Sequence, residues 1–326
     1  MCTRVVYSGS NGMVATGRSM DWKTDMHSNL WVFPRGMKRN GETGENSLEW
    51  TSRYGSVVTS AFEIASTDGM NEKGLVANLL WLPETEYPVR DKNKPGLAIT
   101  AWVQYMLDNF APVEEAVAYI DEDTFQVVSD MMPDGSRLAT LHLSISDATG
   151  DCAIFEYIGG KLTVYHSKEY KVMTNSPTYN KQLALSEYWK SIGGLSFLPG
   201  TNRAADRFAR ASFYINALPE TDDERIAVAS VFSVVRNASV PYGISTPESP
   251  EISTTQWRTV SESKNLRYFF ESSLTPNTFW VNLKDFDLSE GAPVFKLSIA
   301  NGEMYHGNTA KNFKTALPFK FMGVKG

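Results

Sequence analysis

The residues best suited to chemistry stand at the start of the chain, in MCTRVVYSGS. Cys2 directly follows Met1, and a thiol becomes a strong nucleophile once a base or a cation favours its thiolate. Removal of Met1 would give Cys2 a free α-amine, whose ordinary pKa of about 8 leaves part of it neutral and able to act as a base. Nucleophile and base would then belong to one residue. The alternative is that Cys2 is an incidental second residue.

Two charged residues in the stretch GRSMDW, Arg18 and Asp21, are candidates to support this thiol. Asn11-Gly12 is typical of a tight hairpin turn, and it separates two strand-like runs over residues 3–9 and 13–20. A hairpin brings the start of one strand beside the end of the other. Arg18 could therefore favour the thiolate, and Asp21 could hold the α-ammonium or orient the amine. An ordinary Arg–Asp surface pair fits the spacing equally well.

Other kinds of site find little support in the sequence. The four histidines show no metal-ligand spacing, and the HExxH, GxSxG, GxGxxG and P-loop motifs are absent. The second cysteine, Cys152, forms no CxxC pair, and the sequence does not establish a disulfide with Cys2. The net charge of −6 disfavours a nucleic-acid binder, and no apolar run approaches the length of a membrane span. We therefore expect no metal site, no nucleic-acid partner and no membrane partner.

The elements that must position these residues come in blocks. The strand-like runs lie over residues 3–9, 13–20, 31–37, 54–62, 74–82, 138–147, 151–158, 161–167, 170–175, 254–272, 278–286 and 293–301. Helical spacing covers residues 98–110, 113–122, 204–218 and 225–235, the last preceded by a capping box of Thr221 and Glu224. Blocks of this kind favour α+β layering over a parallel βαβ sheet. Without a linker or a repeat, we expect a single domain over residues 1–326, with sheets inside and helices outside.

Several motifs together resemble one known family. They are MCTR, GRSMDW, DGMNEKGL, VMTNSPTY, FLPG followed by ADRF, and TTQW, and they run in the family's order over nearly the whole chain. The chain is similar to the choloylglycine hydrolases, or linear-amide C–N hydrolases, which include bile salt hydrolases and penicillin V acylases. The resemblance implies an αββα sandwich of the N-terminal-nucleophile hydrolase type and amide hydrolysis through an acyl-enzyme. It also implies no cofactor and a homo-oligomer, which in many members is a tetramer.

The same resemblance implies roles for individual residues. Cys2 is the nucleophile, and Arg18 and Asp21 line its site. Asn175, in VMTNSP, falls at the family's oxyanion asparagine, whose side-chain amide can donate to a tetrahedral intermediate. Arg207, in ADRF, resembles the remaining arginine of the site.

One position departs from the family pattern. Bile salt hydrolases carry asparagine in the stretch after NEKGL and other penicillin acylases carry tyrosine, whereas this chain has Trp81. An indole lacks the carboxamide donor, so we expect the second oxyanion contact from a backbone N–H near Trp81. Trp22 is a second tryptophan close to the nucleophile. The pair resembles the branch typical of Gram-negative bacteria, which includes penicillin V acylases and acyl-homoserine-lactone acylases; core packing is the alternative role for both indoles.

We therefore expect an amidase that acts on a small-molecule linear amide with an aromatic or aliphatic acyl group, such as penicillin V or an acyl-homoserine lactone. A bile salt hydrolase is the alternative within the family. A non-catalytic binding protein on the same scaffold is the alternative from another class. The first residues show no basic and apolar leader, which predicts a cytoplasmic protein, although a mature periplasmic chain restarted with Met1 would read identically.

Overall fold

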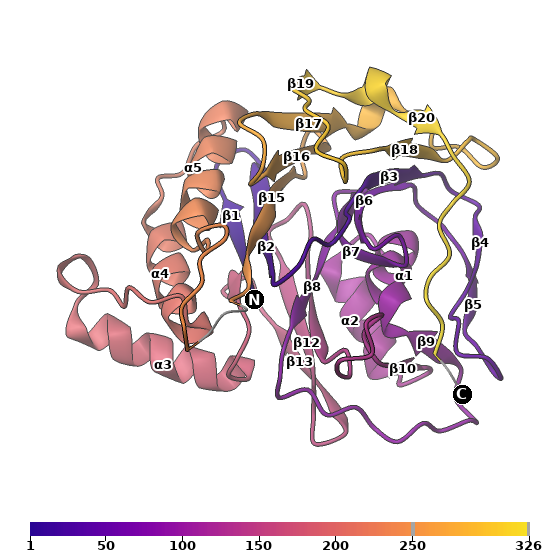
Figure 1. The fold of residues 1–326 in the computed structure, drawn as a ribbon, viewed down its shortest axis with the longest axis horizontal. Helices are drawn as coiled ribbons and strands as arrows, with labels where there is room; N and C mark the ends of the chain where they lie inside the picture. Colours follow the sequence, from indigo (N-terminus) through magenta and orange to yellow (C-terminus); the bar gives the residue numbers. More distant parts are fainter. Residues whose placement is uncertain (249–251, 325–326) are drawn as a thin grey trace.

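Two stacked β-sheets form the centre of the molecule, and helices cover both outer faces (Figure 1). The computed structural model describes residues 1–248 and 252–324. The first sheet has seven strands in the order β14-β1-β2-β15-β16-β17-β19, and the second has nine in the order β13-β12-β11-β8-β7-β6-β3-β18-β20. Two further pairs, β4 with β5 and β9 with β10, lie outside these sheets.

The strands of the first sheet are β1 (Cys2–Ser8), β2 (Val14–Trp22), β14 (Val172–Met173), β15 (Thr254–Glu262), β16 (Arg267–Ser272), β17 (Thr278–Asn282) and β19 (Gly307–Asn308). Those of the second are β3 (Leu30–Phe33), β6 (Ser56–Ala61), β7 (Ala65–Asn71), β8 (Val76–Trp81), β11 (Leu141–Ser146), β12 (Cys152–Ile158), β13 (Lys161–His166), β18 (Phe295–Leu297) and β20 (Lys314–Thr315). The short pairs are β4 (Lys38–Asn40) with β5 (Glu49–Thr51), and β9 (Gly96–Ala98) with β10 (Gln126–Val128).

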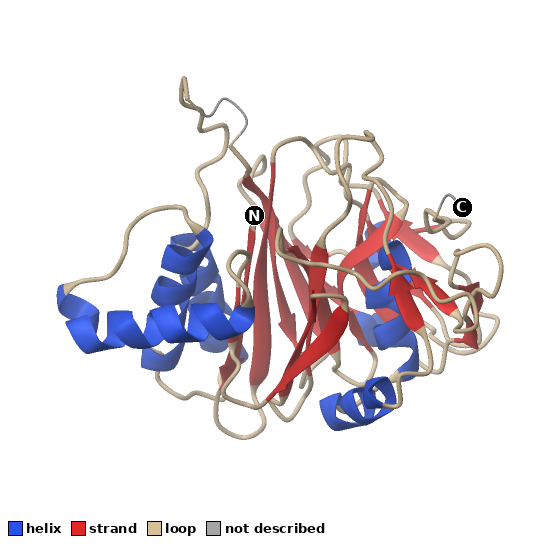
Figure 2. Cartoon of the chain, turned by 90° about the horizontal axis from the view of Figure 1, so that it is seen from below, coloured by secondary structure: helices blue, strands red, loops and turns tan. Residues whose placement is uncertain are grey.

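The helices fall into two groups on opposite sides of the sheets. They are α1 (Trp102–Asn109), α2 (Val113–Asp121), α3 (Tyr179–Ile192), α4 (Ala204–Ala217) and α5 (Glu224–Asn237). Helices α4 and α5 pack on β1 and β2, whereas α1 packs on β7 and β8. Figure 2 shows the two groups flanking the strands. The predicted α+β architecture, an αββα sandwich, is confirmed; that residues 1–326 form a single domain stays a prediction.

The hairpin that follows Cys2 is confirmed. Strands β1 and β2 pair antiparallel, with Cys2 opposite Met20. At the turn, Asn11 and Gly12 have φ values of 51° and 72°, in the left-handed region that Asn and Gly adopt most readily. Their sequence therefore fixes the hairpin's tight turn.

The predicted start of α5 is wrong by a few residues. We expected Thr221 to cap this helix, but the N-cap is Asp223, whose carboxylate accepts hydrogen bonds from the backbone N–H groups of Arg225 and Ile226. Thr221 instead accepts one from the backbone N–H of Asp223. The acidic residue prevails because it lies directly before the first helical residue and complements the positive end of the helix dipole.

Strand ends converge on one end of the sandwich. There β1 begins and β2 ends, with β15 beginning beside β2, since Thr255 pairs with Asp21. Strand β8 ends nearby at Trp81. Because side chains alternate along a strand, Arg18 and Asp21 leave β2 on opposite faces. Arg18 points toward the second sheet, and Asp21 points toward the helices.

Candidate active site

The thiol of Cys2 lies on the face of β1 that looks toward the second sheet. Its side chain is almost fully buried. Nη2 of Arg18 lies 3.6 Å from Sγ, and the sulfur of Met20 lies 3.8 Å from it. A guanidinium at this distance can stabilise negative charge that develops on the sulfur during a reaction. The predicted neighbourhood of Cys2 and Arg18 is therefore present in the fold.

Arg18 is fully buried, and several contacts hold its guanidinium in one position. Its Nη1 and Nη2 groups donate to the backbone carbonyls of Thr67 and Leu79, at 2.9 and 2.8 Å. Its guanidinium lies 4.9 Å from the ring centroid of Trp257, a cation–π contact. These contacts leave the arginine little freedom to turn away from the sulfur.

Asp68 is the carboxylate that faces Arg18, at 3.6 Å. Burial raises its pKa, and the charge of Arg18 opposes that shift. The carboxylate also accepts hydrogen bonds from Asn78 at 2.6 Å and from the hydroxyl of Tyr268. Asp68 thus compensates part of the buried charge without reaching the thiol itself.

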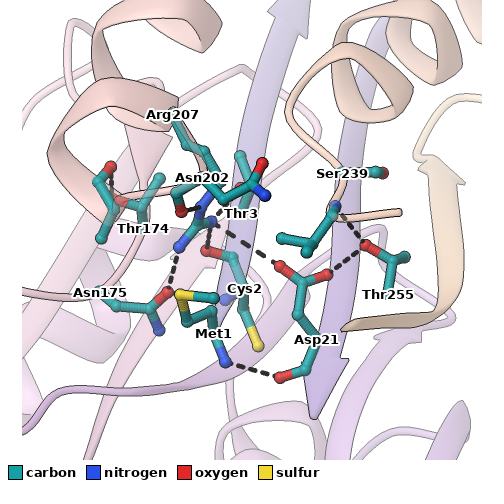
Figure 3. Close-up of polar contacts among 12 residues, drawn as sticks. Met1, Cys2, Thr3, Asp21, Thr174, Asn175, Asn202, Arg207, Ser239 and Thr255 are labelled. Atoms are coloured by element: carbon teal, nitrogen blue, oxygen red, sulfur yellow. Dashed lines mark hydrogen bonds and ion pairs between the residues drawn. The ribbon is translucent and has the colours of Figure 1, made fainter. Parts of the chain in front are cut away.

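Asp21 lies on the opposite face of β2, beside the backbone of Cys2 (Figure 3). Its Oδ1 accepts a hydrogen bond from the Thr255 hydroxyl at 2.6 Å. Its Oδ2 is buried, makes no hydrogen bond within the described part of the chain, and lies 3.8 Å from the guanidinium of Arg207. This oxygen is available to a cation formed at the backbone nitrogen of Cys2.

Arg207 extends from α4 and fixes the backbone around the thiol (Figure 3). It donates to the carbonyl oxygen of Cys2 at 2.5 Å, to the hydroxyl of Thr3 at 2.6 Å and to Oδ1 of Asn175 at 2.7 Å. Burial lowers its pKa, and the charge of Asp21 acts in the opposite direction. Arg207 therefore orients three groups of the site: the Cys2 backbone, Thr3 and Asn175.

The side-chain amide of Asn175 has a fixed orientation. Its Oδ1 accepts from the backbone N–H of Cys2 at 2.7 Å as well as from Arg207. Its Nδ2 must then point the other way, and it donates to the carbonyl of Trp81 at 2.6 Å. This leaves the second N–H of the amide, next to the backbone of Cys2, as a candidate donor.

The peptide of Trp81 supplies a second candidate donor. In the antiparallel pairing of β8 with β11, the N–H of Leu82 donates to Thr140, so the peptide groups of Leu79 and Trp81 face away from β11. The carbonyl of Leu79 accepts from Arg18 on that side. The pairing of β8 with β7 extends no further than Asn78, so the N–H of Trp81 lies beyond it. This geometry agrees with the expected backbone donor.

The two tryptophans form a wall beside the thiol. The ring centroids of Trp22 and Trp81 are 5.3 Å apart, with the rings tilted by 53°. The guanidinium of Arg137 lies 4.5 Å from the Trp81 ring and 5.4 Å from the Trp22 ring. Both indoles thus line the site, and the exposed Arg137 covers them.

Cys2, Arg18 and both indoles open onto one pocket with an almost entirely apolar lining. The pocket contains about 800 Å³ of unfilled space, part of which is open to solvent. Apart from the thiol end, it is lined by residues from the ends of β6 and β8, the start of β7, the loop before β11 and the C-terminal segment. A pocket of this kind suits an apolar group of a small molecule.

Met1 precedes Cys2 in this structure, and its ammonium donates to the backbone carbonyl of Asp21 at 2.6 Å. Burial lowers the pKa of this ammonium. The nitrogen of Cys2 is therefore a peptide nitrogen here, which carries no basic lone pair.

The fold brings together every residue that the sequence analysis singled out for this site. It also adds four that the analysis did not assign. Asp68, Thr255 and Trp257 lie within the motifs DGMNEKGL and TTQW, so their position in these motifs was the available signal. Arg137 lies in the loop before β11, outside any motif, and nothing in its local sequence marks it.

Other kinds of function find no support in the described residues. Among residues 1–248 and 252–324, no group of three or more His, Cys, Asp or Glu side chains could hold a metal ion. Within the same residues, no helix combines the length and the apolar character needed to cross a bilayer. Both cysteines are free.

Comparison with known proteins places the chain in a family. The model of the linear amide C–N hydrolases, choloylglycine hydrolase family, matches residues 2–296. The chain belongs to this family. The members of this family are enzymes that hydrolyse linear amide bonds, as the sequence motifs indicated.

Individual relatives agree with this placement. The chain is 50% identical to a penicillin V acylase of Pectobacterium atrosepticum, across 99% of this chain and 92% of that protein. It is 28% identical to a bile salt hydrolase/transferase of Clostridium perfringens, across 74% of this chain and 80% of the other. Among solved structures, penicillin V acylase from Agrobacterium tumefaciens superposes with a TM-score of 0.93 at 56% identity, covering 99% of this chain and 100% of that one.

Proposed function

We propose that this member of the family cleaves linear amides through an acyl-enzyme on Cys2, once Cys2 is the first residue of the chain. The observation that carries the proposal is the position of the thiol. It lines a deep apolar pocket, lies 3.6 Å from a guanidinium, and has its own backbone held by Asn175 and Arg207. A structural cysteine needs none of these neighbours.

Acylation begins with proton transfer within Cys2. The free α-amine takes the thiol proton, and the sulfur attacks the carbonyl carbon of the amide. The α-ammonium that forms is stabilised by Oδ1 of Asn175, which in this structure accepts from the same nitrogen at 2.7 Å. Oδ2 of Asp21, which makes no hydrogen bond among the described residues and lies 3.8 Å from Arg207, adds a negative charge nearby. Burial lowers the pKa of the Met1 ammonium in the same surroundings. The same desolvation would favour the neutral, basic form of the Cys2 amine.

The tetrahedral intermediate carries its negative charge on the former carbonyl oxygen. Nδ2 of Asn175 and the backbone N–H of Trp81 are the donors that would bind this oxygen. One such donor typically contributes about 3–4 kcal/mol to transition-state stabilisation. The indole of Trp81 takes no part in this step; its peptide does.

Collapse of the intermediate breaks the C–N bond, and the leaving amine takes the proton from the α-ammonium. A water molecule then attacks the thioester while the α-amine accepts one of its protons. When the C–S bond breaks, the sulfur recovers that proton and the carboxylic acid departs. The original thiol proton thus leaves with the amine product, a proton from water replaces it on the sulfur, and one water is consumed for each amide cleaved.

For the substrate we propose penicillin V, acyl-homoserine lactones, or both. The similarity to penicillin V acylases over nearly the whole chain supports the first. The apolar pocket and its two indoles support a flat aryl group or an extended acyl chain over a bulky steroid. A homotetramer and a cytoplasmic or periplasmic location stay predictions, which light scattering and cell fractionation would test.

The experiment that tests the proposal is a substrate panel on processed enzyme. It compares kcat/KM for penicillin V, long-chain acyl-homoserine lactones and glycine- or taurine-conjugated bile salts. We expect penicillin V or the lactone to exceed glycocholate by about ten- to hundredfold, because exchanging apolar contacts gives a preference of that size. A preference for glycocholate would overturn the substrate assignment. If no amide in the panel is cleaved, the proposed amide hydrolysis is wrong.

A further inference from the structure

The wall of the pocket away from Cys2 contains the C-terminal segment of the chain. Met322, Gly323 and Val324 line the same pocket as the thiol. The family model matches residues 2–296, so this segment lies outside the part of the chain that the model describes. In Figure 1 it descends past β4 and β5, on the side away from the N-terminus.

The segment is fixed in place by hydrogen bonds from three directions. The backbone N–H of Met322 donates to the carbonyl of Ile64 at 2.9 Å, and its carbonyl accepts from the hydroxyl of Thr100 at 2.8 Å. The N–H of Val324 donates to the carbonyl of Glu42 at 2.9 Å. A Cβ at Gly323 would lie 2.8 Å from that same carbonyl, so glycine permits this close approach.

Aromatic packing anchors the residues just before the segment. The ring of Phe319 lies 5.3 Å from Trp31 and 5.2 Å from Phe321, and the side chain of Phe321 is buried. Aromatic packing therefore holds the chain just before residues 322–324, and backbone hydrogen bonds hold these residues themselves. A wall fixed in this way keeps a constant position along the pocket.

Strand β7 gives the distance between the two ends. Arg18, beside the thiol, donates to the carbonyl of Thr67, and Met322 is bonded to Ile64, three residues earlier in the chain. Thr67, Ala65 and Ile64 all line the pocket. At ~3.4 Å for each residue of a strand, Ala65, the first residue of β7, lies roughly 7 Å from Thr67. The tail is hydrogen-bonded to Ile64, in the turn just before that strand.

We propose that residues 322–324 form the end wall of the acyl pocket and set the length of acyl chain that the enzyme accepts. The inference rests on the proposed function. It commits to an extended aliphatic acyl group that lies along β7, with its carboxamide at Cys2 and its end against Met322. A phenoxyacetyl group would fill only the part near the indoles.

The test uses processed enzyme and a homologous series of straight-chain N-acyl homoserine lactones, from butanoyl to tetradecanoyl. For the wild type, we expect kcat/KM to rise by about fourfold for each methylene buried and then to stop rising at one chain length. Met322→Ala should move this break to longer chains, and Val324→Phe should move it to shorter ones. The effect of both variants should be smallest on the butanoyl substrate, whose acyl chain is too short to reach residue 322.

Leu317→Ala is the matched control, because this residue is 89% exposed in the same C-terminal stretch and does not line the pocket. Its break should not move. A break that stays at the wild-type length in both active variants would overturn the inference, as would a wild-type series with no break. Failure of the wild type on every member would instead count against the proposed function. If one variant does not fold, the other decides the outcome.

Discussion

The wall around Cys2 and the wall around Met322 are built in contrasting ways. Near Cys2, buried polar side chains hold one another: Arg207 alone donates to Cys2, Thr3 and Asn175. Near Met322, most side chains that face the pocket are apolar, and Met322 itself is held by backbone hydrogen bonds and by the hydroxyl of Thr100. A change in the first wall leaves buried groups unpaired, whereas a change in the second alters mainly volume. Catalysis should therefore depend on a few residues of the first wall, and substrate preference on many residues of the second.

The largest expected effect comes from removal of the nucleophile, which tests whether catalysis depends on the wall around Cys2. Cys2→Ala should lower turnover by about 10⁴-fold or more and leave the fold intact, because no other group supplies the bond to the acyl carbon. Iodoacetamide should place a single label on Cys2 of the wild type. Cys152→Ala is the matched control and should retain activity, since burial raises the pKa of the Cys152 thiol and it lies outside the pocket. Full activity in Cys2→Ala would end the proposal.

A residue retained before Cys2 should also silence the enzyme. An uncleaved N-terminal tag converts the basic amine into a peptide nitrogen while the thiol stays present and reduced. In the cleaved enzyme, kcat/KM should be full above the pKa of the α-amine and fall as the pH drops through it, because protonation removes the base. The pH at which kcat/KM falls would then give the pKa of the Cys2 α-amine, a group whose ordinary pKa is about 8. Mass spectrometry identifies the form, and normal turnover by the tagged form would show that another base serves.

Asn175→Asp separates the anchor from the donor. The aspartate keeps oxygens for the N–H of Cys2 and for Arg207 but loses the Nδ2 donor. We expect kcat to fall by about 10²–10³-fold, the usual effect of one lost oxyanion donor. Labelling of Cys2 by iodoacetamide should continue, because the thiol is untouched. A kcat within tenfold of the wild type would remove Asn175 from the oxyanion site.

Trp81→Ala tests the apolar wall. We expect kcat/KM for the preferred substrate to fall by about ten- to hundredfold, since one lost apolar contact is worth about 1–3 kcal/mol. The peptide N–H of residue 81 remains, so the reaction should continue at a reduced rate. Trp189→Ala, in α3 and outside the pocket, is the control and should change little. An unchanged kcat/KM for the preferred substrate would contradict a role in acyl recognition.

Arg137→Gln should have the smallest effect. The guanidinium lies over both indoles, and an exposed cation–π contact contributes about 0.5–1 kcal/mol. We expect KM to rise by a few-fold with kcat nearly unchanged, and Arg137→Lys to recover part of the loss. A large fall in kcat would instead place Arg137 in the chemistry.

The two walls also differ in how far the sequence predicts them. The proximity of Cys2 and Arg18 follows from local chemistry, because Asn11-Gly12 fixes a hairpin that pairs their strands. Asn175 lies far along the chain, and only the family resemblance pointed to it. Such contacts depend on how one sheet packs on the other, and no local periodicity encodes that.

Arg137 and Met322 were not predicted for a related reason. Arg137 lies in a loop, and Met322 lies near the end of the chain, so neither has a repeating pattern around it. Their places in the pocket depend on long-range contacts, such as the bond between Met322 and Ile64. The hairpin, the helix blocks and the layer order could be predicted, whereas the distant pocket wall required the structure.

The buried ammonium of Met1 has a consequence for the timing of maturation. It donates to the carbonyl of Asp21 just before β1 begins, so removal of Met1 from the folded chain would first require this hydrogen bond to break. Cleavage must precede closure of the sheet or exploit transient fraying of its first residues. Synthesis that outruns the peptidase would thus trap molecules with a native fold and a blocked amine. The active fraction of a preparation would then depend on the rate of Met1 removal relative to the rate of folding.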